Sequence, residues 1–131
     1  MAGNPVLIDS CWYIAAMRMG RHPLRDLRPI SEVRDIATCG VIRSEVARGI
    51  REKGLLEKFQ ARWEVMLYVP TDNRLWADVE ETVWGLDRAG KILPLADVVI
   101  ACCARRIGAV VLTFDPHFQM IPGIVAVDRI V

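Results

Sequence analysis

Four acidic residues occupy positions from which they can act together: Asp9, Glu45, Asp97 and Asp115. Asp9 and Asp115 each come just after a short apolar run, while Glu45 and Asp97 lie near the starts of expected helices. Crowded carboxylates repel one another, so they need raised pKa values or a bound cation. Oxygen ligation that leaves room for water is the preference of Mg²⁺ or Mn²⁺. Such an ion activates water near neutral pH and stabilises charge on phosphodiester oxygens, so the pattern favours phosphoryl chemistry.

Three of these acids also have a simpler structural explanation. Asp9 would cap the helix that follows it, although Ser10 would supply the same cap. Asp115 begins an Asp-Pro turn. Glu45 would pair with Arg48 three residues on, a contact worth about 0.2–0.5 kcal/mol. Each explanation suffices for one acid, but none accounts for the joint pattern.

Asp97 is the most informative acid, because it is the only ionisable residue from Ile92 to Ala104. Stabilisation of the helix dipole by an exposed acid in the first turn, worth about 0.3–1 kcal/mol, is the simple explanation. A buried unpaired carboxylate would cost several times more. If Asp97 lies inside the protein, we therefore expect it to have a cation as partner.

The elements that must position these acids alternate between strands and helices. Short continuous apolar runs predict buried strands at Val6–Ile8, Ile36–Cys39, Val65–Val69, Val110–Thr113 and Ile124–Val127. Helices are expected at Cys11–Met17, Val41–Arg51, Leu55–Trp63, Asn73–Gly90 and Pro94–Ile107, with Gly54 separating the second from the third. This alternation predicts an α/β fold, a three-layer α/β/α sandwich with a central, mostly parallel sheet. Function in such sheets gathers at the carboxyl edge of the strands.

In order along the chain, these segments resemble the PIN domain, and most closely the short single-domain ribonuclease toxins of VapBC type toxin-antitoxin pairs. The matching segments are Val6-Leu7-Ile8-Asp9-Ser10, Ser44-Glu45-Val46, Leu95-Ala96-Asp97-Val98-Val99-Ile100-Ala101, Leu112-Thr113-Phe114-Asp115-Pro116-His117-Phe118 and Ile121-Pro122-Gly123. They span essentially the whole chain, which we expect to form a single PIN-like domain over residues 1–131. The sequence departs from the family in the bulky Cys11 and Trp12 and in Pro116.

The resemblance implies a strand order of 3-2-1-4-5 and an endoribonuclease that hydrolyses structured RNA with Mg²⁺ or Mn²⁺. It makes the four acids the catalytic and metal-binding residues, with Ser10 and Thr113 as supporting polar residues. It also implies that a cognate antitoxin holds the enzyme inactive. The alternative is a catalytically idle PIN-like module that only binds RNA or protein, although such a module has no reason to keep a repulsive cluster of acids.

Composition limits the other possibilities. At 131 residues and 53% hydrophobic, the chain is one ordinary domain with a generous core. A net charge of +1 excludes binding to nucleic acid through bulk positive charge, so RNA would need a local patch. Basic residues outnumber acidic ones between Arg18 and Lys53, where Arg43 and Arg48 are expected to contact RNA phosphates. An ordinary solvated face with ion pairs is the alternative interpretation.

Several residue types bear on compartment and partners. The N-terminal residues form no basic leader followed by an apolar run, and no segment is apolar enough for a membrane helix, so we expect a cytoplasmic protein. The four cysteines form no C-x-x-C spacing and are expected to be small buried hydrophobic residues. The aromatic residues are expected in the core or in a homodimer contact, with base stacking as the alternative: Trp12, Tyr13, Trp63, Trp76 and Trp84.

Other chemistries have weaker support. Metal-free cleavage would use His22 and His117, which nothing in the sequence positions. No phosphate-cradling glycine loop is present. Phosphoryl capture on an aspartate requires an Asp-x-Asp motif or a late lysine, and Asp9 is followed by Ser-Cys while no lysine follows Lys91.

Overall fold

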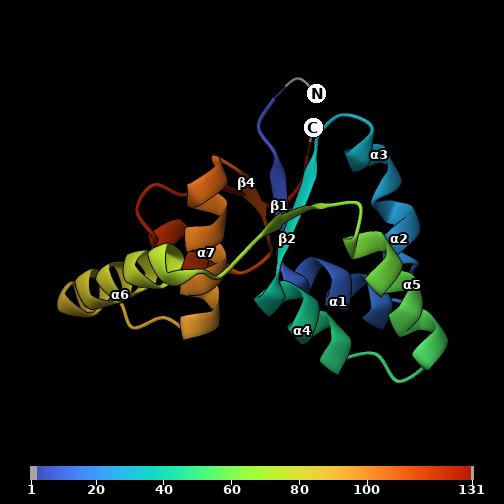
Figure 1. Ribbon diagram of the computed structural model, residues 1–131, viewed down its shortest axis with the longest axis horizontal. Coiled ribbons are helices and arrows are strands. Elements are labelled where there is room, and N and C mark those ends of the chain that lie inside the picture. Colours follow the sequence, from blue (N-terminus) through green and yellow to red (C-terminus); the bar gives the residue numbers. More distant parts are fainter. Residues whose placement is uncertain (1–2, 131) are drawn as a thin grey trace.

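Five parallel strands form the centre of the molecule, in the order β3-β2-β1-β4-β5 (Figure 1). The computed structural model describes residues 3–130. Its strands are β1 (Val6–Ile8), β2 (Ile36–Cys39), β3 (Leu67–Val69), β4 (Val110–Leu112) and β5 (Ala126–Val127). The expected parallel α/β sandwich and its strand order are confirmed.

Helices cover both faces of this sheet. They are α1 (Ser10–Arg18), α2 (Pro23–Asp26), α3 (Arg28–Ser31), α4 (Gly40–Arg48), α5 (Lys53–Trp63), α6 (Asn73–Arg88), α7 (Leu95–Ile107) and the 3₁₀ helix η1 (Pro116–Met120). In Figure 1, α6 and α7 lie to one side of the strands, and α1, α2, α3 and α5 lie to the other. Within residues 3–130, no helix has the length and apolar character needed to cross a bilayer.

Two predicted boundaries are wrong. Gly54 does not separate two helices, because α4 ends at Arg48 and Gly54 is the second residue of α5. The break falls at Gly49, whose N–H donates to the Val46 carbonyl as α4 ends. The expected strand at 65–69 is also too long, because Val65 lies in the turn that leaves α5, with its N–H bonded to the Arg62 carbonyl.

Three short helices were not predicted, namely α2, α3 and η1. Each has proline at its first or second position, where the fixed φ of the ring suits a first turn. They are only four or five residues long, too short to show the 3.6-residue periodicity by which helices are recognised.

The burial of α7 sets the environment of Asp97. Residues from Val98 to Ala104 are all buried, because α7 lies against α6 on one side and contacts β4 on another. An element apolar on nearly every face belongs in the interior. Asp97, in the first turn of α7, thus directly precedes the buried residues of this helix.

The aromatic residues divide between core and surface. Tyr13 and Trp63 are buried and pack edge to face, with ring centroids 5.2 Å apart. Trp12 contacts Tyr13 in the same geometry at 5.3 Å. Trp76 and Trp84 on α6 are instead exposed, which excludes the core for these two and leaves a homodimer contact or base stacking as their expected roles.

Candidate active site

Asp9 is buried at the point where β1 ends, with 3% of its surface exposed. It occupies the N-cap position of α1, but its side chain makes no capping hydrogen bond. One carboxylate oxygen, Oδ2, instead accepts a hydrogen bond from Thr113 Oγ1 at 2.8 Å. The helix-cap explanation therefore does not account for this carboxylate, which faces the neighbouring strand end at β4.

Ser10 links Asp9 to Glu45. Its hydroxyl donates to Glu45 Oε1 at 2.8 Å and lies 3.5 Å from Asp9 Oδ1. Glu45 reaches this position from α4, which contacts α1. None of the ion pairs among residues 3–130 joins Glu45 to Arg48, so the expected surface pair is not the role of Glu45 in this structure.

Asp97 and Asp115 meet at His117. The imidazole Nδ1 lies 2.9 Å from Asp97 Oδ2 and 3.1 Å from Asp115 Oδ1. Asp115 Oδ1 also accepts the backbone N–H of His117 at 2.9 Å, which caps η1. The turn explanation for Asp115 is thus correct, and the same turn brings His117 back toward the two carboxylates.

The protonation equilibria of this group reflect its crowding. Burial raises the pKa of Asp97, the hydrogen bond from His117 lowers it, and the nearby charges of Asp115 and Asp9 raise it further. The hydrogen bond to Asp97 raises the pKa of His117, and the charge of Asp115 adds to this effect. A proton on the imidazole thus offsets part of the repulsion between the carboxylates.

Thr113 holds several parts of the site together. Its hydroxyl donates to Asp9 and accepts the backbone N–H of Asp115 at 3.0 Å. Since the hydroxyl hydrogen is used on Asp9, the Cys11 thiol is the donor in the 3.4 Å contact between Cys11 Sγ and Thr113 Oγ1. Burial, with the charge of Asp9, raises the pKa of Cys11 to about 11, so the thiol stays protonated near neutral pH.

The structure therefore joins all the predicted acids through one network of polar contacts. One branch runs from Asp9 through Ser10 to Glu45. The other runs from Asp9 through Thr113 to Asp115, and on through His117 to Asp97. The tightest group is Asp97, Asp115 and His117, which offer ligand atoms within 4.8 Å of one another. Asp9 and Glu45 lie outside that group.

Sequence reasoning missed two residues of this network. The prediction that nothing positions His117 is wrong, because two aspartates hold its imidazole. The usable signal was the Asp-Pro-His order, since an aspartate that caps a proline-led turn brings the residue two positions on back toward itself. Cys11 is half-buried in the site, whereas Cys39, Cys102 and Cys103 are buried as expected.

The metal-free histidine pair has no structural support. His22 precedes α2 and lines a cavity with Lys58 and Phe59 of α5. His117 lies in η1 beside Asp97. The two imidazoles belong to different surroundings, so they cannot share a substrate proton as acid and base.

The two expected phosphate contacts lie on α4. Arg43 is half-buried, with its guanidinium 5.9 Å from the ring centre of Tyr68. Arg48 is exposed at the end of the helix. Neither forms an ion pair within residues 3–130.

A parallel α/β/α sandwich with acids at the carboxyl edge of β1 and β4 defines the class to which this protein belongs. The PIN domain family model matches residues 6–124, so the chain belongs to the PIN domain family. A search of the curated proteins gave no match.

Solved structures with the same fold include several VapBC complexes and a toxin-antitoxin complex from Klebsiella pneumoniae. VapBC2 from Rickettsia felis, bound to a DNA fragment from its promoter, contains a chain that matches with a TM-score of 0.76 and 16% identity over 94% of this chain and 97% of that one. VapBC-1 from nontypeable Haemophilus influenzae matches with a TM-score of 0.74 and 17% identity, covering 95% and 97%. DNA-bound VapBC from Salmonella typhimurium matches with a TM-score of 0.72 and 17% identity, covering 95% and 98%. Likeness at this level of identity establishes the fold.

Proposed function

We propose that this chain is a metal-dependent endoribonuclease of VapC type that hydrolyses phosphodiester bonds in structured RNA. The observation that carries the proposal is the network joining Asp9, Glu45, Asp97 and Asp115 beside the strand ends. Within this network, the carboxylates of Asp97 and Asp115 offer ligand oxygens within 4.8 Å of each other, which is costly without a cation and is not required by a purely structural role. Membership of the PIN domain family supports the same conclusion.

The residues present fit Mg²⁺ or Mn²⁺. Asp97 and Asp115 supply carboxylate oxygens and His117 an imidazole nitrogen within 4.8 Å of one another, and these are ligands that Mn²⁺ accepts. We assign Asp97 and Asp115 as the central ligands, with Asp9 and Glu45 completing the site. When bound, the ion would activate water and stabilise the charge that develops on the phosphodiester.

The remaining residues orient the acids. Thr113 fixes one oxygen of Asp9, and Ser10 fixes one oxygen of Glu45. Before an ion binds, the hydrogen bond between His117 Nδ1 and Asp97 keeps the loop after β4 in place. These bonds hold the carboxylates ready, so little rearrangement is needed when a cation and substrate arrive.

Arg43 and Arg48 are proposed to contact RNA phosphates on the α4 side of the site. A guanidinium binds phosphate with its planar fork, and both side chains lie on the helix that supplies Glu45. With a net charge of only +1, local arginines rather than the whole molecule would attract the RNA.

The partners are proposed from the relatives. The solved complexes of the same fold are toxin-antitoxin pairs, so we propose that a cognate antitoxin neutralises this chain. A homodimer and a cytoplasmic location are also proposed, and the four free thiols suit a reducing compartment. Co-expression with the adjacent reading frame, followed by size-exclusion chromatography, tests the partner and the oligomeric state.

The activity is tested with the purified chain and a panel of transfer and ribosomal RNA fragments. Cleavage is expected with Mn²⁺ or Mg²⁺ and should stop when a chelator is added. Asp9→Asn, Asp97→Asn and Asp115→Asn should each lower the rate by at least about a hundredfold while leaving RNA binding intact. The exposed Asp87→Asn on α6 is the matched control and should cleave like the wild type.

Two outcomes would contradict the proposal. Cleavage that persists in chelator would mean that no divalent ion is needed. RNA binding without cleavage of any fragment in the presence of Mn²⁺ would favour the idle binding module.

A further inference from the structure

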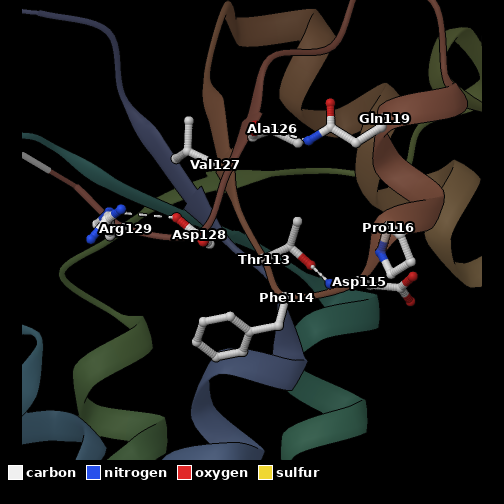
Figure 2. A pocket seen from close by; sticks show the side chains of 9 residues that line it. All are labelled: Thr113, Phe114, Asp115, Pro116, Gln119, Ala126, Val127, Asp128 and Arg129. Carbon is white, nitrogen blue, oxygen red and sulfur yellow. Dashed lines mark hydrogen bonds and ion pairs between the residues drawn. The ribbon is translucent and has the colours of Figure 1, made fainter.

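An open cavity of about 660 Å³ lies beside the acidic network and shares Thr113 and Asp115 with it (Figure 2). The loop after β4, the helix η1 and the end of β5 form its walls. Any group that enters this cavity lies next to the acids assigned to the reaction. The lining also includes an aromatic ring, an amide and a guanidinium, those of Phe114, Gln119 and Arg129.

Phe114 has an exposed aromatic ring, and hydrogen bonds hold its backbone in place. The side chain is 54% exposed, although its two neighbours in sequence belong to the acidic network. Its backbone N–H donates to Cys11 Sγ at 3.3 Å, and the next N–H, that of Asp115, donates to Thr113 Oγ1. An exposed aromatic ring on an anchored backbone is the kind of surface on which nucleic-acid bases stack.

Polar groups on the other walls suit the rest of a nucleotide. The side chain of Arg129 is 84% exposed, and its nearest carboxylate contact is Asp128 at 3.8 Å, beyond hydrogen-bond distance. Its guanidinium is therefore able to bind a phosphate. The amide nitrogen of Gln119 donates a hydrogen bond to the Ala126 carbonyl at 3.2 Å. This bond fixes the side chain, and the amide oxygen of Gln119 is left as an acceptor.

We propose that this cavity binds an unpaired nucleotide of the RNA substrate next to the cleaved phosphodiester, with its base stacked on Phe114 and a phosphate on Arg129. The inference rests on the proposed ribonuclease function. A base inside a duplex has no free face, so only an unpaired nucleotide reaches the ring. Asp115 and Asp128 oppose an anion here, which makes the positive charge of Arg129 necessary for binding.

The test measures binding of a hairpin oligoribonucleotide whose unpaired loop carries a fluorescent purine analogue. The host is the full chain with Asp97→Asn, so that the RNA stays intact. Phe114→Ala should weaken hairpin binding about tenfold or more and abolish the stacking-induced quenching of the analogue, whereas Phe114→Trp should preserve both. Trp84→Ala is the matched control, because Trp84 is an exposed aromatic residue on α6 outside this cavity.

Arg129 is tested in the same assay. Arg129→Ala should weaken binding and reduce the slope of log affinity against log salt by about one, and Arg129→Lys should restore most of the slope. The fully paired duplex of the same stem should bind all the Phe114 variants equally. Since Phe114 is half exposed, its variants should unfold at the temperature of the host.

The inference is overturned if Phe114→Ala binds the hairpin as tightly as Trp84→Ala does, if hairpin and duplex lose affinity equally, or if the host binds no hairpin. It is also overturned if Phe114→Ala loses only the binding of a protein partner. The two proposals fail separately. If the wild-type chain cleaves no RNA in Mn²⁺ but its hairpin binding depends on Phe114, the proposed hydrolysis is contradicted and the proposed nucleotide site is supported.

Discussion

Thr113 shows how one hydroxyl organises two of the acids. It donates to the buried Asp9 carboxylate at 2.8 Å and accepts the backbone N–H of Asp115 at 3.0 Å. The side chain is 6% exposed, so water does not readily replace these bonds. The arrangement therefore depends on an oxygen at this position rather than on the shape of the side chain alone.

Thr113→Val should lower the free energy of unfolding by about 1–3 kcal/mol, because it leaves a buried carboxylate oxygen and an N–H without their partner. Thr38→Val is the matched control, since Thr38 Oγ1 in β2 is buried without a hydrogen-bond partner. Replacing an unsatisfied hydroxyl by a methyl group should be neutral or stabilising. Urea denaturation of both variants measures the difference, and equal losses would show that Thr113 matters only for packing.

The sequence was enough to predict that the acidic residues share one site, because strand ends converge at one edge of a parallel sheet. The place of His117 was missed, because it depends on a five-residue 3₁₀ helix that turns back on Asp115 and that only the Asp115-Pro116-His117 order indicates. The exposure of Trp76 and Trp84 also escaped prediction, since the apolar positions of α6 at helical spacing do not say which of them face α7.

At the scale of the elements, α6 and α7 are joined near one end by Asp72 and Arg106. Asp72 caps α6 by accepting the Leu75 N–H at 2.9 Å and also accepts two bonds from Arg106, both at 2.7 Å. These bonds, with the Arg106 bond the largest cause, lower the pKa of Asp72 to about 2. The pair fixes α6 against the helix that carries Asp97.

The sign of the pH dependence follows from this shift. The pKa of Asp72 is lower in the folded chain than the value of about 3.9 for an unfolded aspartate, so its contribution to stability is complete above about pH 5. It is lost as the pH falls from about 4 through 2. Asp72→Asn keeps a good cap but removes the charge, and should lower the melting temperature by about 1–4 °C near neutral pH.

Melting curves at several pH values compare Asp72→Asn with the wild type, and the difference should shrink as the pH falls below about 4 and disappear only below the folded-state pKa of about 2. Asp72→Ala, which also removes the cap, should be less stable than Asp72→Asn at every pH. A gap between wild type and Asp72→Asn that stays constant with pH would show that the charge on Asp72 is not what Arg106 stabilises.

The elements themselves followed from the sequence more reliably than their ends. The buried strands β1 and β2 are continuous apolar runs, so their prediction needed no tertiary information. The end of α4 was misplaced because Gly49 and Gly54 are equally plausible helix breakers by type. Gly54 is tolerated near the start of α5, where a Cβ would meet open space and where a helix begins rather than ends.

At the scale of the whole molecule, the cation site that we propose for the acidic network should make stability depend on a divalent ion. Burial raises the pKa of Asp97 and the charges of Asp115 and Asp9 raise it further, so the folded chain opposes ionisation of this carboxylate. His117 compensates only in part, and less as the pH rises through its own raised pKa. A divalent ion that binds only the folded chain would offset this repulsion, and its dissociation constant and concentration would set the gain in stability.

Mn²⁺ at about a hundred times its dissociation constant should therefore raise the melting temperature by about 10 °C, as expected from about 2.7 kcal/mol of added stability. Asp97→Asn should lose most of this gain while its metal-free form changes little, because the variant loses both the repulsion and the bond to His117. Asp87→Asn, an exposed neutralisation on α6, should keep the full gain. Differential scanning fluorimetry with and without chelator measures all three proteins. An Asp97→Asn variant that retains the full metal response would show that Asp97 serves the helix dipole of α7 and not an ion.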